Sequence, residues 1–203
     1  MNKQVRLKED YEGDLRGTNM HVESEDDFFY HGVVSSRCGT YITKFPVDLC
    51  EIKEKPISKQ EKWDKRFFEL TKHVASWSED QSTQVGCVIV GENNEIRTTG
   101  YNGFPRGVID KQERHQRPEK YMWFEHAERN AIYNAARMGT ALDGTTAYLQ
   151  WFPCTDCARA LIQSGIKRVV CVEPDWNIER FNFKTSRQIF SEADVEITFL
   201  ETN

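Results

Sequence analysis

Two short segments of the sequence carry residues that could bind a metal ion. The first reads His126-Ala-Glu128, and the second reads Pro153-Cys154-Thr-Asp-Cys157. One imidazole and two thiolates supply three of the four positions around a tetrahedral zinc ion, which leaves the fourth for water. A zinc ion lowers the pKa of that water, so hydroxide becomes available near neutral pH. The residue types and their spacing therefore predict a catalytic zinc site.

Glu128 lies two positions after the predicted histidine ligand and would bring a carboxyl group beside the metal. Such a group can take a proton from water and pass it to a ring nitrogen and then to a departing amine. A His-x-Glu segment followed by Pro-Cys-x-x-Cys is typical of zinc deaminases. A structural zinc site and a redox Cys-x-x-Cys pair are the alternatives. Neither has a use for Glu128, and no fourth Cys or His follows at ligand spacing near either segment.

The pattern of the sequence predicts that both segments open helices. One helix is predicted over residues 126–138 and another over residues 154–164, each just before a glycine. On this interpretation, His126 and Cys154 lie at helix N-termini. The partial positive charge of a helix N-terminus favours a thiolate over a thiol and helps to hold a bound hydroxide.

The other predicted elements form a sheet that would carry these helices. Helical apolar spacing, a capping box and β-branched runs identify them. They are helices over 58–77 and about 184–192, and strands over 84–90, 96–101, 145–150, 168–172 and 195–200. Residues 105–122 are charged and irregular. A helix, two strands and repeated helix–strand units favour a mixed sheet with helices on both faces.

The composition limits the classes of protein to which the chain can belong. With 203 residues, 38% hydrophobic and 29% charged, it is typical of a globular protein. No apolar run approaches a membrane span and the first residues lack a secretory signal, so a cytoplasmic location is expected. The formal charge is −5, and residues 1–30 hold eight acidic against four basic residues, so the remainder is near neutral. That balance disfavours nucleic acid as a partner.

Residues 1–55 are interpreted as an N-terminal extension of unknown role, and residues 56–203 as the catalytic domain. The extension lacks sustained periodicity, with strands expected only around 29–34 and 40–43. A second metal site is conceivable from the histidines and cysteines in this region. Without a closely spaced ligand pair it is disfavoured. The four residues concerned are His21, His31, Cys38 and Cys50.

From about Ser58 to Leu200 the chain resembles the deoxycytidylate (dCMP) deaminase family of the cytidine deaminase superfamily. The zinc motif points to the superfamily, whereas a Gly-Tyr-Asn-Gly-x-Pro loop and a Gln-Ser-Gly-Ile-Lys segment resemble the dCMP branch. The segments that carry the resemblance are residues 82–90, 99–107, 126–132, 151–158 and 162–167.

The resemblance implies a three-layer αβα fold around a five-stranded mixed sheet, together with a homo-oligomer that is often a hexamer. It implies a hydrolase of cyclic amidine C–N bonds that converts dCMP to dUMP and ammonia and so feeds thymidylate (dTMP) synthesis. In that reaction a zinc-bound hydroxide attacks C4 of cytosine. Several relatives are allosteric, with dCTP and dTTP as effectors that bind at the loop corresponding to residues 100–103.

The resemblance also implies roles for individual residues. His126, Cys154 and Cys157 would bind zinc, and Glu128 would be the proton shuttle. The expected substrate contacts are Asn102 with the sugar, Trp151, Phe152 and Pro153 along the base pocket, Trp176 near the nucleotide, and Arg137 with nucleotide or another subunit. The alternatives are a turn position for Asn102, core packing for Trp151 and Phe152, and a solvated helix position for Arg137. Relatives tend to have a tyrosine where Trp176 stands. An indole cannot accept a hydrogen bond, which puts a phosphate contact through a hydroxyl in doubt there.

Two other functions stay open on the sequence. The same chemistry could act on another cytosine substrate: a nucleoside, dCTP, a modified dCMP or single-stranded nucleic acid. Five basic residues between Arg106 and Lys120 keep the nucleic-acid version open, although a solvated loop is the simpler interpretation. Alternatively, the chain is a zinc-stabilised regulatory or assembly module. Glu128 discriminates against this last hypothesis because a purely structural site does not need it.

Overall fold

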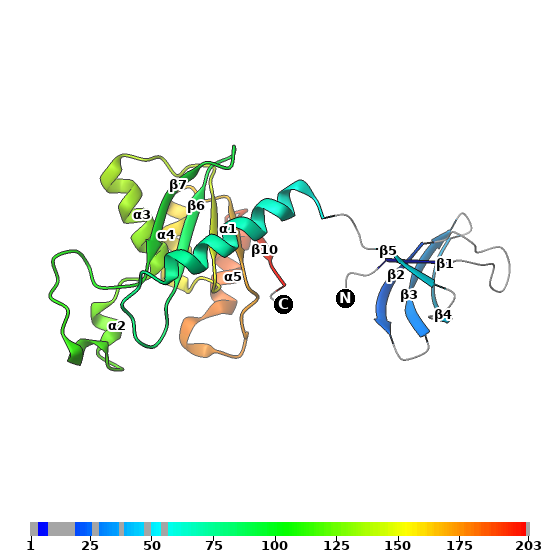
Figure 1. Ribbon diagram of the computed structural model, residues 1–203, viewed down its shortest axis with the longest axis horizontal. Helices are drawn as coiled ribbons and strands as arrows, with labels where there is room; N and C mark the ends of the chain where they lie inside the picture. The colour runs from blue at the N-terminus through cyan, green and yellow to red at the C-terminus, as the bar shows by residue number, and fades with distance from the viewer. Residues whose placement is uncertain are drawn as a thin grey trace. The chain divides into compact units, whose positions relative to one another are not determined.

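The computed structural model describes residues 57–201 in full and, before them, the backbone of five strands. The chain divides into two compact units, Met1–Ser58 and Lys59–Asn203 (Figure 1). The division lies close to the boundary expected after residue 55. Among the described residues, no helix is long and apolar enough to cross a membrane.

The N-terminal unit contains a single antiparallel sheet with strand order β4-β3-β2-β1-β5. Its strands are β1 Gln4–Leu7, β2 Asn19–Glu25, β3 Phe29–Ser36, β4 Gly39–Pro46 and β5 Cys50–Lys53. The first strand pairs with both the second and the last, and the register of β2 against β3 shifts between Val22 and Ser24. The sequence predicts only parts of β3 and β4, because β1 and β5 have only four residues each and β2 contains charged residues among its seven.

The backbone register aligns residues of the five strands in rows. One row consists of apolar residue types: Tyr41, Val34, Met20, Val5 and Ile52. The next row is mixed: Ile42, Val33, His21, Gln4 and Lys53.

The second metal site considered from the sequence, at His21, His31, Cys38 and Cys50, lies outside the residues whose side chains the structure describes.

The second unit is a five-stranded sheet with strand order β10-β9-β8-β6-β7. Its strands are β6 Gly86–Val90, β7 Ile96–Tyr101, β8 Thr146–Leu149, β9 Arg168–Cys171 and β10 Glu196–Phe199. Its helices are α1 Lys59–Ala75, α2 Lys120–Trp123, α3 Ala127–Met138, α4 Thr155–Gln163 and α5 Phe183–Glu192, with 3₁₀ turns η2 Gln112–His115 and η3 Glu179–Phe181. The predicted elements are confirmed, and sequence analysis missed only η2, α2 and η3.

The sheet is mixed because one strand runs against the other four. β6 is antiparallel to both β7 and β8, whereas β8, β9 and β10 are mutually parallel. The carboxyl ends of β7, β8, β9 and β10 therefore meet at one edge. In sheets of this kind, functional groups gather at that edge.

Alternate residues of β6 pack into two separate cores, which produces three layers. Cys87 and Ile89 lie with residues of α3, α4 and α5, while Val88 and Val90 lie with residues of α1. The α1 helix thus covers one face of the sheet, and the helices that carry the predicted ligands cover the other (Figure 1). The predicted αβα fold is confirmed.

Two glycines set how closely the helices approach the sheet. A Cβ atom at Gly100 in β7 would overlap the backbone of Ala127 and Ala131 in α3. A Cβ at Gly86 in β6 would overlap the backbone of Thr71 in α1. Only glycine fits such contacts, so the position of α3, and of the residue that precedes it, depends on Gly100.

A buried polar cluster fixes α1 to the sheet. Asp64 of α1 accepts hydrogen bonds from Arg168 Nη1 at 2.9 Å and Nη2 at 2.7 Å, and from Tyr148 Oη at 2.8 Å. Burial raises the pKa of Asp64, but hydrogen bonds from Arg168, Gln60 and Tyr148 outweigh it, and the pKa falls below the ordinary 3.8. The ionised carboxylate is thus part of the folded state.

Removing the guanidinium should leave this carboxylate unpaired. We expect Arg168→Met to lower the free energy of unfolding by about 3 kcal/mol, whereas Tyr148→Phe, which removes one hydroxyl, should cost about 1 kcal/mol. Because the folded pKa of Asp64 is lowered, its stabilisation is complete above the ordinary value of 3.8 and is lost as the pH falls through the folded pKa. Urea denaturation at several pH values measures both effects. Equal losses in the two variants would contradict the expectation.

Candidate metal centre and active site

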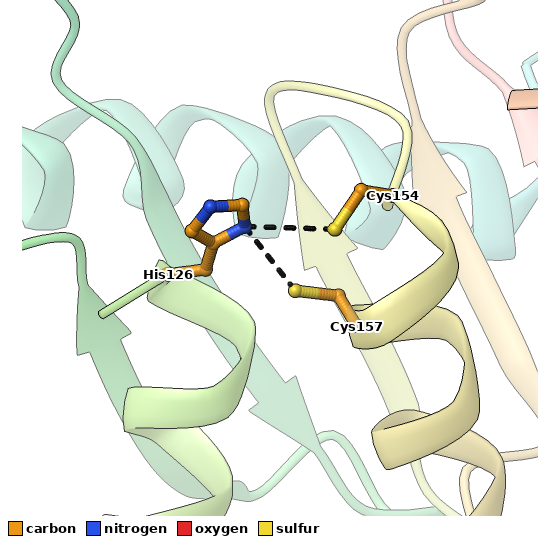
Figure 2. A group of neighbouring side chains, drawn as sticks. All are labelled: His126, Cys154 and Cys157. Carbon is orange, nitrogen blue, oxygen red and sulfur yellow. Dashed lines mark hydrogen bonds between the residues drawn. The ribbon is translucent and has the colours of Figure 1, made fainter. Parts of the chain in front are cut away.

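The three predicted metal ligands lie together at the carboxyl edge of the sheet. His126 immediately precedes α3, Cys154 immediately precedes α4, and Cys157 lies in the first turn of α4. The Nδ1 atom of His126 is 3.7 Å from Cys154 Sγ and 3.4 Å from Cys157 Sγ (Figure 2). All three ligand atoms lie within 4.8 Å of one another. Among the described residues, this is the one group of its kind.

Two helix N-termini converge on this group, as the sequence predicts. His126 and Cys154 both have extended backbone at the N-cap position, which turns the chain from the edge of the sheet into the helix. The pKa of Cys154 is lowered to about 4 by a hydrogen bond from the Cys157 thiol, helped by a hydrogen bond with His126. A thiolate, which is the form that binds metals, is therefore favoured at Cys154.

Glu128 lies in the first turn of α3 and is only 6% exposed. Burial raises the pKa of its carboxyl group, and the negative charge of Cys154 raises it further, although the charge of His126 acts in the opposite direction. Raising a carboxyl pKa toward neutrality makes the group a better proton donor and acceptor at physiological pH. This environment is suited to the predicted proton transfer.

A charged brace, formed by Glu125, Arg129 and Asp156, joins the two ligand segments and was not predicted from the sequence. Glu125 Oε1 accepts hydrogen bonds from the His126 backbone N–H at 2.9 Å and from Arg129 Nε at 2.6 Å. Arg129 Nη1 lies 3.8 Å from Oδ2 of Asp156, a residue that lies between the two cysteines in the sequence. The guanidinium also interacts with the charge of both cysteine sulfurs. The spacing of four residues between Glu125 and Arg129 is the signal that could have indicated this pair.

The structure places Asn102 in a closed hydrogen-bond network. It is buried, and its Nδ2 donates to Thr83 O at 2.8 Å and to Asp80 Oδ2 at 3.1 Å. Its Oδ1 accepts from the Val85 N–H at 2.7 Å. Both amide hydrogens and one oxygen lone pair are therefore used within the protein. A contact with the sugar is left to the remaining lone pair, which can only accept.

A buried lysine extends this network toward the metal ligands. Lys120 is 5% exposed, and its Nζ donates to Asp80 Oδ2 and to Ser82 Oγ, both at 2.6 Å. Backbone hydrogen bonds of 3.1 and 2.8 Å then join Gly103 to Glu125, the residue before His126. The network thus ties the loop between α1 and β6, and the loop between β7 and α3, to one ligand. Asp80 and Lys120 lie 40 positions apart, and their pairing was not predicted from the sequence.

The aromatic residues predicted to line the base pocket have different environments. Phe152 is 3% exposed and packs against the rings of Trp176, Phe183, Phe190 and Phe199, so it is a core residue. Pro153 is also buried, and its carbonyl accepts a hydrogen bond from Ser186. Trp151, in contrast, is 50% exposed. Of these three residues, Trp151 alone presents a large surface to solvent.

The remaining two predicted contacts also differ. Trp176 packs on Phe152 and donates from Nε1 to Glu173 Oε1 at 3.0 Å, so its single donor is used. Arg137 is exposed in the last turn of α3, eleven residues beyond His126. At 1.5 Å per residue, that separation is roughly 16 Å along the helix. The structure therefore does not bring Arg137 to this chain's metal-ligand group.

Comparison with known proteins agrees with this geometry. Residues 61–173 match the model of the cytidine and deoxycytidylate deaminase zinc-binding region. An uncharacterised deaminase of Aliivibrio fischeri is 44% identical over 142 residues, which cover 68% of this chain and 94% of the relative. Human deoxycytidylate deaminase is 33% identical over 66% of this chain and 76% of its own length.

A solved structure supports the fold independently. The dCMP deaminase of cyanophage S-TIM5, in complex with dCMP and dUMP, aligns with a TM-score of 0.57 at 21% identity. The alignment covers 73% of this chain and all of the phage protein. With its ligand geometry, its αβα layers and the matched zinc-binding region, the chain belongs to the cytidine and deoxycytidylate deaminase family.

Proposed function

We propose that this chain is a zinc-dependent hydrolase that converts dCMP to dUMP and ammonia. The observation that carries the proposal is the grouping of His126, Cys154 and Cys157 beside the buried carboxyl of Glu128. The resemblance to human deoxycytidylate deaminase at 33% identity, and to a protein of Drosophila melanogaster named as a probable deoxycytidylate deaminase at 36% identity, supports dCMP as the substrate.

The residues present fit a zinc ion. One imidazole nitrogen and two sulfurs within 4.8 Å of one another are a donor set that zinc prefers, at bond lengths of about 2.0–2.3 Å. When bound, zinc supplies an acidified water as the nucleophile. Arg129 would offset the negative charge that two thiolates add, and Glu125 would hold the backbone of His126 in place.

Glu128 would carry the protons of the reaction. A C4–O bond to the water oxygen forms and the C4–N bond to the amine breaks. The carboxylate takes one proton from water and gives it to N3 of the ring. The same carboxylate then takes the remaining proton from the oxygen added at C4 and gives it to the amine, which leaves as ammonia while the C4=O bond forms. Its burial suits both steps, since a carboxyl with a raised pKa exchanges protons more readily near neutral pH.

We propose further that the enzyme is a cytoplasmic homo-oligomer that feeds thymidylate synthesis. Tyr133 and Met138 of α3 are 47% and 80% exposed, and a subunit contact over α3 would cover these apolar side chains. A pocket of about 250 Å³ borders Tyr101 and Gly103 of the loop predicted to bind dCTP and dTTP. Both observations support assembly and regulation as parts of the proposal.

Replacing Glu128 by Gln should abolish proton transfer while preserving the shape of the side chain. We expect a fall of about 10²- to 10⁴-fold in kcat for dCMP, with the zinc content unchanged. Ammonia release would be measured with dCMP, deoxycytidine, dCTP and single-stranded DNA. A Glu128→Gln variant as active as the parent would contradict the catalytic role. Preference for another cytosine substrate would contradict the choice of dCMP.

If the charged brace supports the metal ligands, removing the charge of Arg129 should lower the affinity of the protein for zinc. Arg129→Gln should weaken zinc binding about 10- to 100-fold, because the residues that support metal ligands typically contribute that much. Arg159→Gln is the matched control, since Arg159 also pairs with Asp156 but is exposed. Competition with a chromogenic chelator measures both. Identical affinities in the two variants would show that Arg129 has no special role.

A further inference from the structure

Three loops leave the carboxyl edge of the sheet and surround the proposed active site. The loop after β7 ends at His126, and the loop after β8 ends at Cys154. The third, residues 172–182, follows β9, whose neighbour β8 is parallel to it. Figure 1 shows the segment with α2 and the loop before α5 extending from the same end of the sheet. A substrate entering at this edge would meet both.

A direct contact joins the first and third of these loops. Arg180 of η3 donates from Nη1 to Tyr121 Oη of α2 at 2.7 Å. The guanidinium carbon lies 5.0 Å from the centroid of the Tyr121 ring and 4.2 Å from that of the Phe181 ring. Tyr121 is five residues before the ligand His126. The pair therefore joins α2, which precedes the metal ligands in the sequence, to η3, which follows them.

Ring contacts connect Arg180 to the second ligand segment. Phe181 stacks on Phe183 with centroids 5.2 Å apart, and Phe183 packs edge-on against Phe152 at 5.8 Å. Phe152 lies two residues before Cys154. The η3 turn ends at Asn182, whose φ of 51° is a left-handed conformation that asparagine tolerates better than most residues. These contacts hold η3, and with it Arg180, against the core beside the second ligand segment.

Arg180 differs from Lys120 and Arg129 in its charge balance. Lys120 forms an ion pair with Asp80, and Arg129 forms one with Glu125. Arg180 is exposed, and within residues 57–201 no carboxylate lies within 4.0 Å of its guanidinium. Its charge is therefore available to an anionic ligand.

We propose that Arg180 and Tyr121 bind the 5′-phosphate of the nucleotide substrate. The inference rests on the proposed function, because it concerns which part of dCMP the mouth of the site recognises. A guanidinium can hold two phosphate oxygens at once. The Tyr121 oxygen accepts from Arg180, which leaves its own hydrogen to donate to a third oxygen. The pair distinguishes a nucleoside monophosphate from the corresponding nucleoside.

The test compares ligands with and without the phosphate. Arg180→Gln should lower kcat/KM for dCMP about 10- to 100-fold, mainly through KM, and leave deoxycytidine turnover unchanged, since charge-assisted hydrogen bonds contribute on that scale. Arg180→Lys should recover part of the loss, and Tyr121→Phe should lose less than Arg180→Gln. Arg66→Gln is the matched control, because Arg66 is also exposed over an aromatic ring but lies on α1. It should change neither substrate.

Binding of the product keeps the test independent of turnover. Calorimetry on the zinc-loaded protein should show dUMP binding more tightly than deoxyuridine, with the preference reduced in Arg180→Gln. If the parent deaminates dCMP but Arg180→Gln keeps the preference for dUMP, the phosphate site is wrong while the proposed function stands. If Arg187→Gln alone removes the preference, the guanidinium over Trp176 is the anchor, and the inference is also wrong. A parent that binds dUMP and deoxyuridine equally overturns it whatever reaction it catalyses.

Discussion

The concentration of negative charge around the ligand group is the constraint on which the rest of the structure depends. Two cysteine sulfurs and the carboxyl of Glu128 lie together in a largely buried place, where isolated charges are costly. Two helix N-termini, the guanidinium of Arg129 and the zinc ion would offset that cost. The helix N-termini lie at one edge of the sheet, and Gly100 lets α3 approach β7 closely. Glu125 holds Arg129 by a hydrogen bond, so these positive groups lie around the same ligands.

Buried ion pairs hold both ends of the catalytic unit. The Asp64–Arg168 pair joins α1 to the start of β9, and the Asp80–Lys120 pair joins the loops at the carboxyl edge. Each carboxylate accepts several further hydrogen bonds, so neither is a buried charge without compensation. Hydrophobic packing alone would allow the loops to shift against the sheet. Directional bonds to Asp80 fix the loop that precedes His126.

The metal ligands and most elements of the catalytic unit could be predicted because their signals are local. The two cysteines are three residues apart, and helical spacing is visible within a few turns. Asp80 and Lys120 could not be predicted, because their partnership exists only after the chain has folded. The place of Phe152 beside Cys154 left a pocket wall and core packing equally open, and only the folded chain shows that four other rings pack around it. In the N-terminal unit, strands as short as β1 give too few alternations to identify.

The environment of Asn102 also affects the chemical lifetime of the protein. An asparagine followed by glycine is prone to lose its amide spontaneously, when the glycine nitrogen attacks the side-chain carbonyl carbon. Here the Gly103 N–H is bonded to Glu125 O, and the Asn102 amide is held by Asp80 and Thr83. Neither group can turn toward the other without breaking these bonds. The hydrogen bonds that order the loop thus protect an Asn-Gly sequence from deamidation. A variant that lacks these bonds would accumulate aspartate and isoaspartate at this position.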